Sequence, residues 1–354
     1  MKIYNIFIIT FLSLVIFSCG SEKKSTTPNF SLKIDGETTK FPLNAAFKAT
    51  VINPNNANVS GVAYTINDKE LTNSNANPLV LQTIIPETAL LGKHTLKAVV
   101  TFDDGKTTSV KKNLTILSNS KPKIYTYKIV NTFPHDQRAY TQGLEFYRDT
   151  LFESTGQRGQ SSLRKVDYKT GKIIQKIDLE QRYFGEGITV LNNKLYMLTW
   201  RANTGFIFNP NNLERLDTFT YQNSKEGWGF CNDGEKLFKS DGTEKIWILD
   251  PATLQEQYAI QVCDHKRTYV KANELEYIDG KIFANSYQNP SMMIINPKNG
   301  ALEGIVDFRG LKEKVTNHPQ IDVFNGIAYN PKTKTYFVTG KYWDKMFEVE
   351  IMEK

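Results

Sequence analysis

The sequence has few of the residues that usually bind metals or form covalent crosslinks. Its 354 residues include three cysteines and four histidines. The histidines stand far apart, with no spacing typical of a ligand set: His94, His135, His265 and His318. We therefore expect neither a metal site nor a cofactor, and we place His135 and His318 in loops.

A concentrated basic segment is also missing. The formal net charge is +7, but the densest basic run in the body of the chain is Lys111-Lys112, and there is no arginine cluster. A nucleic-acid-binding surface needs a stripe of positive charge. The sequence therefore predicts a mixed, solvated surface and no nucleic-acid partner.

The apolar run at the start of the chain is too short to cross a membrane comfortably. It extends from Ile6 to Phe17 and ends in Ser18-Cys19-Gly20, which resembles a bacterial lipobox. We predict a lipoprotein signal peptide over residues 1–18, a lipid anchor on Cys19 and a tether over residues 19–29. The protein would then be exported and held at the cell envelope, as a periplasmic or outer-membrane lipoprotein. The alternative is a plain secretory signal with an incidental cysteine.

Two cysteines remain, Cys231 and Cys263, and export would permit a disulfide between them. Their predicted positions, at the inner and outer parts of one repeat unit described below, are too far apart for that bond. We therefore expect two buried free thiols.

Residues 30–117 have the pattern of short strands separated by turns. The alternating segments are Phe30 to Ile34, Val59 to Ile66, Leu79 to Ile85, His94 to Phe102 and Thr107 to Ile116. Asp103-Asp104-Gly105 is a hairpin signal between the last two. This pattern predicts a small immunoglobulin-like β-sandwich without catalytic residues, followed by a linker over residues 118–123.

The rest of the chain repeats itself. A small, acidic or amide residue before an apolar strand recurs five times, about every 42–52 residues. The copies are Gln142-Gly143-Leu144, Glu186-Gly187-Ile188, Trp228-Gly229-Phe230, Asn273-Glu274-Leu275 and Asn325-Gly326-Ile327. Four strands fit each full unit, which is propeller spacing. The sequence predicts an all-β chain with a five-bladed β-propeller over residues 124–354. Its fifth unit lacks an outer strand, which Ile124 to Thr132 can supply.

In a propeller the innermost strands begin around one central opening, so functional side chains are expected at the repeat starts. The starts carry Gln142, Glu186, Trp228, Asn273 and Asn325, and the second strands end near Trp200, Tyr287 and Lys341. One carboxylate, several amides, one amine and several aromatic rings would share a pocket, as is typical of a small-ligand site.

Seven segments in order resemble the plant-type glutaminyl-peptide cyclotransferases (glutamine cyclotransferases), a family also found in bacteria. They are Tyr140-Thr141-Gln142-Gly143-Leu144, Phe184-Gly185-Glu186-Gly187-Ile188-Thr189, Tyr196-Met197-Leu198-Thr199-Trp200, Glu226-Gly227-Trp228-Gly229, Asn273-Glu274-Leu275-Glu276-Tyr277, Asn325-Gly326-Ile327-Ala328 and Thr339-Gly340-Lys341-Tyr342-Trp343. The resemblance covers about Tyr127 to Glu350 and none of the first predicted domain.

The resemblance implies a transferase that converts the N-terminal glutamine of peptides or proteins to pyroglutamate and releases ammonia. Glu186 would shuttle the proton, and Lys341, Gln142 and Asn273 would be the other catalytic polar groups. The substrate-binding residues would be Tyr140, Phe184, Trp200, Trp228, Tyr287 and Asn325. Tyr140 replaces a frequent phenylalanine and Tyr287 an expected tryptophan, which puts fine substrate preference in doubt.

The residues alone leave two other functions open. A catalytically silent propeller could bind a partner through its ring face. A metal-dependent lactonase or lyase would need carboxylate and amide ligands converging on a divalent cation, and no Asp stands at an equivalent repeat start. Activity that persists in a chelator would separate the cyclase from such a metalloenzyme.

Overall fold

The computed structural model describes residues 28–36, 38–103 and 105–354. Within these ranges the chain forms 28 β-strands and one 3-10 helix, η1 (Lys312–Lys314), so the all-β prediction is confirmed. The predicted signal peptide and Cys19 lie outside the described residues. No helix in the described part of the chain is long and apolar enough to span a membrane.

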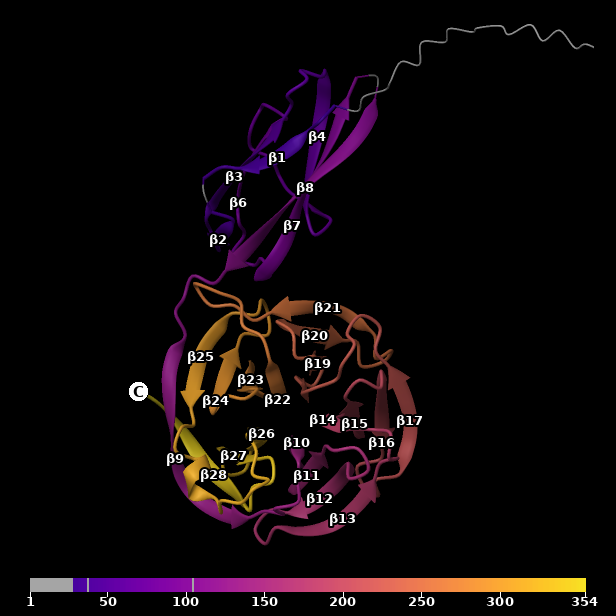
Figure 1. Ribbon diagram of the computed structural model, residues 1–354, viewed down its shortest axis with the longest axis vertical. Helices are drawn as coiled ribbons and strands as arrows, with labels where there is room; N and C mark the ends of the chain where they lie inside the picture. The colour runs from indigo at the N-terminus through magenta and orange to yellow at the C-terminus, as the bar shows by residue number, and fades with distance from the viewer. Residues whose placement is uncertain (1–27, 37, 104) are drawn as a thin grey trace, which may run out of the picture.

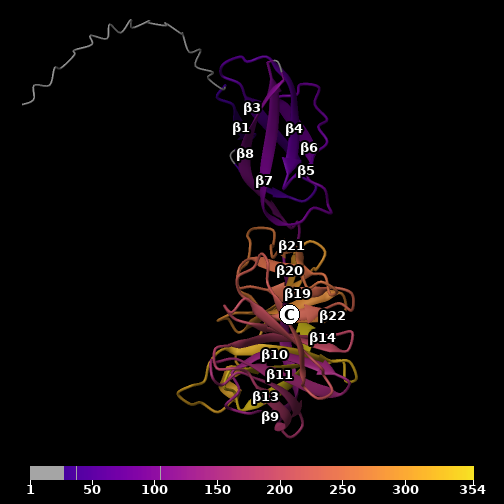
Figure 2. The ribbon, with the colours of Figure 1, turned by 90° about the vertical axis from the view of Figure 1, so that its right-hand side faces the viewer.

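The N-terminal strands form two sheets beside the rest of the molecule (Figure 2). One has the order β1 (Ser31–Ile34), β3 (Ala46–Ile52), β6 (Val80–Ile84); the other has the order β2 (Lys40–Pro42), β8 (Lys106–Leu117), β7 (Gly92–Phe102), β4 (Val59–Ile66), β5 (Lys69–Glu70). The sequence pattern did not predict β2, β3 and β5. Every second residue of β7 is buried, including Leu96 and Val100. This is the period-two pattern of a sheet with one face in a core.

Sheets of four strands follow in chain order around a ring (Figure 1). The first contains β10 (Thr141–Tyr147), β11 (Thr150–Thr155), β12 (Ser162–Asp167) and β13 (Lys172–Asp178). The second contains β14 (Gly185–Leu191), β15 (Lys194–Thr199), β16 (Thr204–Phe208) and β17 (Arg215–Thr220). The third contains β18 (Phe230–Asn232), β19 (Leu237–Ser240), β20 (Lys245–Leu249) and β21 (Glu256–Gln261). Each sheet begins at its inner strand, near the centre of the ring.

The ring is completed by an eight-stranded sheet. It joins β22 (Ala272–Ile278), β23 (Lys281–Ser286), β24 (Ser291–Ile295) and β25 (Leu302–Asp307) to β26 (Phe324–Asn330), β27 (Thr335–Gly340) and β28 (Lys345–Glu353). The strand between the two groups is β9 (Lys123–Pro134), which pairs antiparallel with β28. The predicted closing strand is therefore confirmed. In addition, β9 pairs in parallel with β25 over Lys123 to Tyr125.

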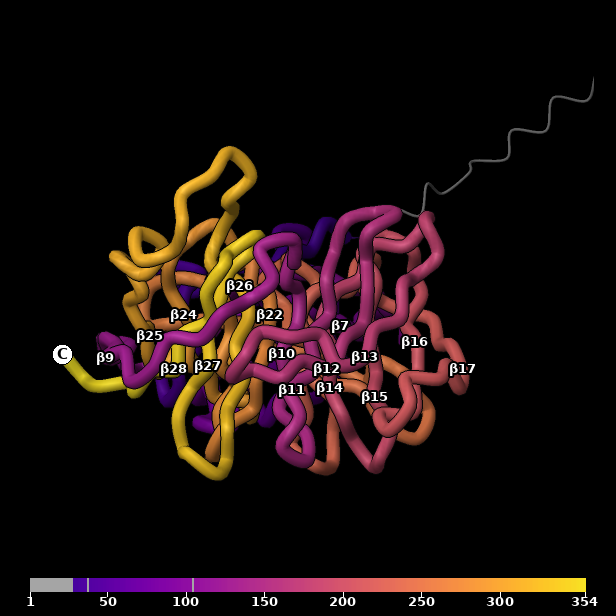
Figure 3. The backbone as a smooth tube through the Cα atoms, turned by 90° about the horizontal axis from the view of Figure 1, so that it is seen from below, coloured from indigo at the N-terminus to yellow at the C-terminus, as the bar shows by residue number. Residues whose placement is uncertain are grey.

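The long connection between β25 and β26 stands out from one face of the ring (Figure 3). It contains η1 and leads into the start of β26, which carries Asn325. It therefore lies at the face where the inner strands begin. The spacing between the last two repeat starts, Asn273 and Asn325, is the longest of the series, and this connection accounts for the extra residues.

The N-terminal sheets contact the outer edge of the ring directly. Leu91 N donates to Asn299 O at 3.0 Å, and Lys93 N donates to Gln261 Oε1 at 2.9 Å. Cys263 of the ring packs in the N-terminal hydrophobic core. Cys231, on the inner strand β18, is also buried, and both thiols are free as predicted.

Truncation provides a test of ring closure. A chain that begins at Pro122 keeps β9, whereas one that begins at Ala139 loses it and leaves β25 and β28 with unpaired edges, which promote aggregation. The second chain also loses His135, whose buried ring contacts Trp343 O and Glu153 Oε1 at 2.8 and 2.9 Å. We expect the first chain to be monodisperse and the second to aggregate in size-exclusion chromatography. Equal behaviour of the two would contradict the closing role of β9.

Candidate active site

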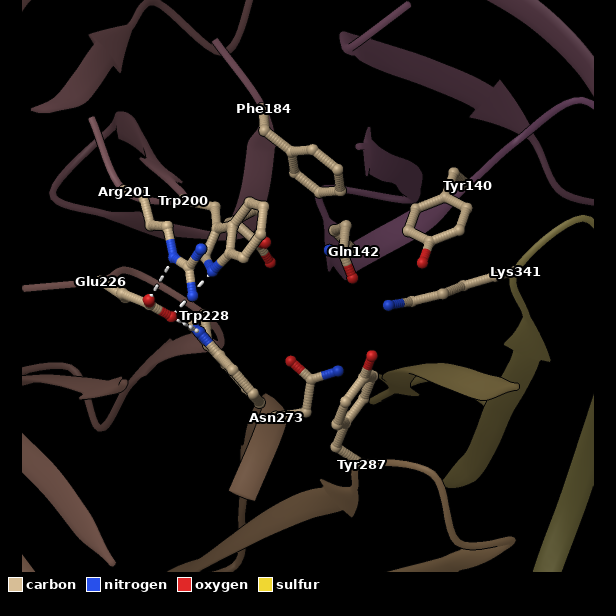
Figure 4. Close-up of a pocket in the computed structure, with 11 residues that line it drawn as sticks. Tyr140, Gln142, Phe184, Trp200, Arg201, Glu226, Trp228, Asn273, Tyr287 and Lys341 are labelled. Atoms are coloured by element: carbon tan, nitrogen blue, oxygen red, sulfur yellow. Dashed lines mark hydrogen bonds and ion pairs between the residues drawn. The ribbon is translucent and has the colours of Figure 1, made fainter. Parts of the chain in front are cut away.

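A cavity of about 360 Å³ opens at the centre of the ring, where the inner strands begin (Figure 4). Its lining combines aromatic rings, amides, two carboxylates and two cations: Tyr140, Gln142, Phe184, Glu186, Trp200, Arg201, Glu226, Trp228, Asn273, Tyr287 and Lys341. The structure thus brings together all the predicted catalytic residues and all the predicted substrate-binding residues except Asn325.

Irregular strand pairing delivers the polar side chains to this cavity. The register of β10 with β11 shifts between Thr141 and Gly143, so Gln142 lies in a bulge. The same shift occurs around Glu186 in β14, around Asn273 in β22 and around Asn325 in β26. A bulge redirects a side chain and ends regular pairing. The repeat therefore places a polar residue in a bulge at the start of each of these four strands.

Glycine permits the inner strands to approach one another at these starts. A Cβ atom on Gly229 would lie 1.9 Å from Asn273 O, and one on Gly187 would lie 2.6 Å from Trp228 O. The neighbouring atoms are backbone, so they have no room to move aside. Strand packing thus requires the small residue of the repeat at Gly187 and Gly229, whereas Glu274 takes this place in the fourth unit.

Glu186 is the buried acid of the site, with 4% of its surface exposed. Its Oε2 atom is buried and accepts no hydrogen bond from the described residues. Burial raises the pKa of Glu186 well above its usual range and nearby Glu226 adds to this, while the Lys341 ammonium and the Gln142 amide act in the opposite direction. An acid of this kind keeps its proton to higher pH than an exposed glutamate does.

Lys341 follows β27 and is 2% exposed. Its nitrogen points into the cavity between Tyr140 and Tyr287 (Figure 4), at 4.5 and 5.4 Å from the two ring centres. Burial lowers the pKa of Lys341, and the carboxylates of Glu186 and Asp322 oppose that effect. Among the described residues Lys341 forms no ion pair within 4.0 Å and no hydrogen bond through its amine, so this nitrogen is available to a ligand.

Asn325 has a different place from the one predicted, because it does not line the cavity. It is fully buried behind the amides, where its Oδ1 accepts from Asn273 Nδ2 at 2.7 Å. Its Nδ2 donates to Gln142 Oε1 at 3.2 Å and to Thr141 O at 2.9 Å. Asn325 therefore orients the two site amides. These bonds leave Asn273 Oδ1 to face a ligand, while the Gln142 amide acts on Glu186.

Glu226 and Arg201 line the cavity as well, although the sequence pattern did not predict them as site residues. Glu226 accepts hydrogen bonds from the indole nitrogens of Trp200 and Trp228 at 2.7 and 2.9 Å, and from Arg201 Nε at 2.6 Å. Burial alone would raise the pKa of Glu226, but these donors lower it overall. Glu226 therefore stays ionised and holds both tryptophans in the wall. The signal in the sequence was its place two residues before Trp228.

Comparisons with known proteins agree with this geometry. The family model for glutamine cyclotransferases matches residues 99–351. The chain belongs to the glutamine cyclotransferase family. A glutaminyl-peptide cyclotransferase of Arabidopsis thaliana is 39% identical over 236 residues, which cover 65% of this chain and 73% of the relative. The crystal structure of Myxococcus xanthus glutaminyl cyclase superposes with a TM-score of 0.62 and 31% identity, covering 66% of this chain and 100% of that one.

The glutamine cyclotransferase match starts earlier in the chain than the sequence resemblance suggested. It begins at residue 99, inside β7, rather than near Tyr127. It therefore includes β8 and the end of β7, strands that the sequence analysis assigned to a separate first domain. The cavity and all its lining residues fall within the match.

A buried ion pair supports the Glu226 side of this cyclotransferase site. Lys239 Nζ lies 3.0 Å from Glu256 Oε1, and both side chains are fully buried. Lys239 also donates to Glu226 O at 3.0 Å, and Glu256 accepts from Ser224 N at 2.9 Å. The pair therefore ties the segment before Trp228 to the third sheet.

We expect Lys239→Met to destabilise the fold by roughly 3–5 kcal/mol, because it leaves a buried carboxylate without its partner. It should also raise KM, since Glu226 loses one of its supports. Thermal unfolding and steady-state kinetics measure the two effects. The double variant Lys239→Met/Glu256→Gln should recover part of the stability, because it removes the unpaired charge and keeps an acceptor for Ser224 N, but it should not restore KM. A single variant with unchanged unfolding temperature would contradict the role of the pair.

Proposed function

We propose that this protein is a glutaminyl-peptide cyclotransferase in which Glu186 shuttles the proton. The observation that carries the proposal is a buried carboxylate with an unpartnered oxygen, placed with a buried amine and two amides in one aromatic-walled cavity. The substrates would be peptides or proteins with an N-terminal glutamine, which membership of the family also supports.

The reaction joins two atoms of the same residue. The neutral α-amine of the glutamine attacks its own γ-amide carbon and closes a five-membered lactam. One amine proton passes to Glu186, and Glu186 returns a proton to the amide nitrogen, which leaves as ammonia. No enzyme nucleophile is needed, so the site has to fold the side chain back, move the proton and exclude water.

The raised pKa of Glu186 suits it to both proton transfers. A carboxylate with a raised pKa is a stronger base, so it can take a proton from the amine and then give one to the leaving nitrogen. The Lys341 ammonium lies where it can stabilise the oxygen that becomes negative in the tetrahedral intermediate. Asn273 Oδ1 can accept an N–H of the substrate, and the rings of Phe184 and Trp228 can enclose its aliphatic carbons.

We also propose a five-bladed β-propeller for residues 124–354 and an immunoglobulin-like sandwich for residues 30–117. The sheets β10–β13, β14–β17, β18–β21 and β22–β25, with β26–β28 closed by β9, support five blades. The pair of facing N-terminal sheets supports the sandwich. We further propose that the protein is exported and lipid-anchored at Cys19. If the Cys19→Ala variant still incorporates labelled palmitate, the anchor at Cys19 is refuted.

Ammonia release from a Gln-initiated peptide is the deciding experiment. The same peptide with an acetylated amine has no nucleophile and should be inert. An Asn-initiated peptide should react poorly, because it would have to close a four-membered ring. Comparable ammonia release from the acetylated peptide would identify a side-chain amidase instead. Running the assay in EDTA tests the metalloenzyme alternative. We expect activity to persist, because the described residues contain no group of three or more His, Cys, Asp or Glu side chains that could hold a metal ion.

A further inference from the structure

A second cavity of about 600 Å³ adjoins the candidate active site. We call it the lysine groove; it is lined by Asn223, Ser224, Lys225, Glu226, Trp228, Asp241, Gly242, Thr243, Glu244, Lys245, Trp247 and Lys271. Glu226 and Trp228 line both cavities. The two spaces are therefore neighbours along the wall that these side chains form.

The shared wall is held rigidly in place. Trp228 donates to Glu226 from its indole nitrogen at 2.9 Å and packs against Tyr287 with ring centres 5.4 Å apart. On the groove side its ring lies on Gly242, where a Cβ atom would come within 2.5 Å of Trp228 Cζ2. A ligand that passes over this wall thus meets a fixed aromatic surface.

The carboxylates of the lysine groove are already occupied. Asp241 accepts hydrogen bonds from Thr243 N at 3.0 Å and from Trp247 Nε1 at 2.7 Å. Glu244 pairs at 3.5 Å with Lys93, which reaches it from β7 in the N-terminal sheets. Glu226 accepts hydrogen bonds from Trp200, Arg201 and Trp228.

The lysines, by contrast, are not neutralised. Within the described ranges, Lys225, Lys245 and Lys271 form no ion pair within 4.0 Å. The amine of Lys245 lies 4.9 Å from the Trp247 ring centre, and that of Lys271 is 3.4 Å from Gln288 Oε1. The lining has three lysines and three carboxylates, but Lys93 and Arg201, which lie outside it, pair with Glu244 and Glu226, so only Asp241 opposes the three lysines. Its surplus charge is positive and faces solvent.

A glutamine seated at Glu186 must send the rest of its peptide out of the first cavity. Both its α-amine and its γ-amide have to be at the buried acid, so only the α-carbonyl and the following residues can leave. An extended chain advances about 3.3–3.6 Å per residue, and a short segment that crosses Trp228 enters the lysine groove.

We propose that the lysine groove binds the residues directly after the N-terminal glutamine and favours substrates with acidic side chains there. This inference rests on the proposed function. The binding is electrostatic and partly solvent-exposed, so it should act on KM rather than on kcat and should weaken with salt.

The test compares Gln-Glu-Glu-Ala, Gln-Ala-Ala-Ala and Gln-Lys-Lys-Ala peptides by ammonia release. We expect kcat/KM for the acidic peptide to exceed that for the basic peptide by about tenfold at low salt. The ratio should approach one in 0.5 M NaCl, on the order of the salt at which the Debye length falls to a few ångströms. It should also collapse or invert in Lys225→Glu/Lys245→Glu.

Lys236→Glu is the matched control. Lys236 is an exposed lysine next to β19, in the same sheet, at the opposite end from the cavity. It makes the same change of net charge as Lys225→Glu or Lys245→Glu alone, each of which should lower the ratio, and it should itself leave the ratio of the wild-type protein intact. The proposed role of the groove would be overturned by a kcat/KM ratio of acidic to basic peptide near one in the wild type, or by a ratio that the double variant does not change.

Binding of the product peptides separates this proposal from the proposed function. Pyroglutamyl-Glu-Glu-Ala and pyroglutamyl-Lys-Lys-Ala can be titrated calorimetrically without turnover. If no peptide releases ammonia, the proposed function fails, and tighter binding of the acidic product would still support the groove. Equal binding of the two products would overturn it, whatever the turnover.

Discussion

Glu186→Gln is expected to lower kcat for a Gln-initiated peptide by roughly 10²–10⁴-fold, which is the usual contribution of a positioned acid–base group. The substitution is nearly isosteric, so the cavity should keep its shape. It removes the buried carboxylate that, in our proposal, accepts the proton of the amine and returns one to the leaving nitrogen. The measurement is steady-state ammonia release with saturating peptide.

The same substitution should leave the fold intact or slightly stabilise it. The Oε2 atom of Glu186 is buried without a hydrogen-bond partner, and a buried carboxylate in that position costs folding free energy. An amide carries no charge to desolvate. We therefore expect an unfolding temperature at or above that of the wild type, which separates loss of chemistry from loss of structure.

Glu276→Gln provides a matched control for this result. Glu276 is also buried on an inner strand, burial and Glu145 also raise its pKa, and it accepts a hydrogen bond from Tyr329 N at 2.9 Å. It does not line the cavity, and a glutamine oxygen can accept the same bond. Its kcat should stay within about threefold of wild type, as for a change remote from the reacting atoms. Activity of Glu186→Gln in that same range would refute the assignment of Glu186.

Much of the candidate site was predictable because one repeated motif generates it. A small, acidic or amide residue before an apolar strand recurs, and the structure makes bulges there around Gln142, Glu186, Asn273 and Asn325. The repeat does not state which bulged side chain points into the cavity and which supports its neighbours. Asn325 follows the motif as well as Asn273 does, yet it lies behind the lining because its amide is bonded on both sides.

Residues outside the repeat pattern could not be located in the same way. Arg201 lies just after β15 with a φ of 56°, and its contact with Glu226 comes from the next sheet. His135 lies in a loop directly after β9, as expected, but the sequence does not show that it is buried between Glu153 and Trp343, residues brought together only by ring closure. In the N-terminal sheets, β2 and β5 have three and two residues, too few to show alternation.

The pH dependence of a Lys341 variant tests the electrostatics of the site most directly. The Lys341 ammonium lowers the pKa of Glu186 against the larger effect of burial. Lys341→Met keeps an unbranched side chain of similar length but removes the charge, so the pKa of Glu186 should rise further. At a given pH a smaller fraction of Glu186 is then ionised and able to accept the proton of the α-amine.

The ascending limb of kcat against pH should therefore move to higher pH in Lys341→Met, and kcat at pH 7 should fall by about 10²–10³-fold, because a donor to the developing oxyanion is lost as well. The peptide's own amine, with a pKa of about 7.7–8.0, contributes equally in both proteins, so the difference between the two profiles reports on Glu186. Lys341→Arg retains the charge and should keep the limb near its wild-type position even if kcat falls through misplacement. A limb that stays in place or moves to lower pH in Lys341→Met would show that the Lys341 charge does not control Glu186. In that case the Lys341 ammonium would stabilise the developing oxyanion without changing the pKa of Glu186.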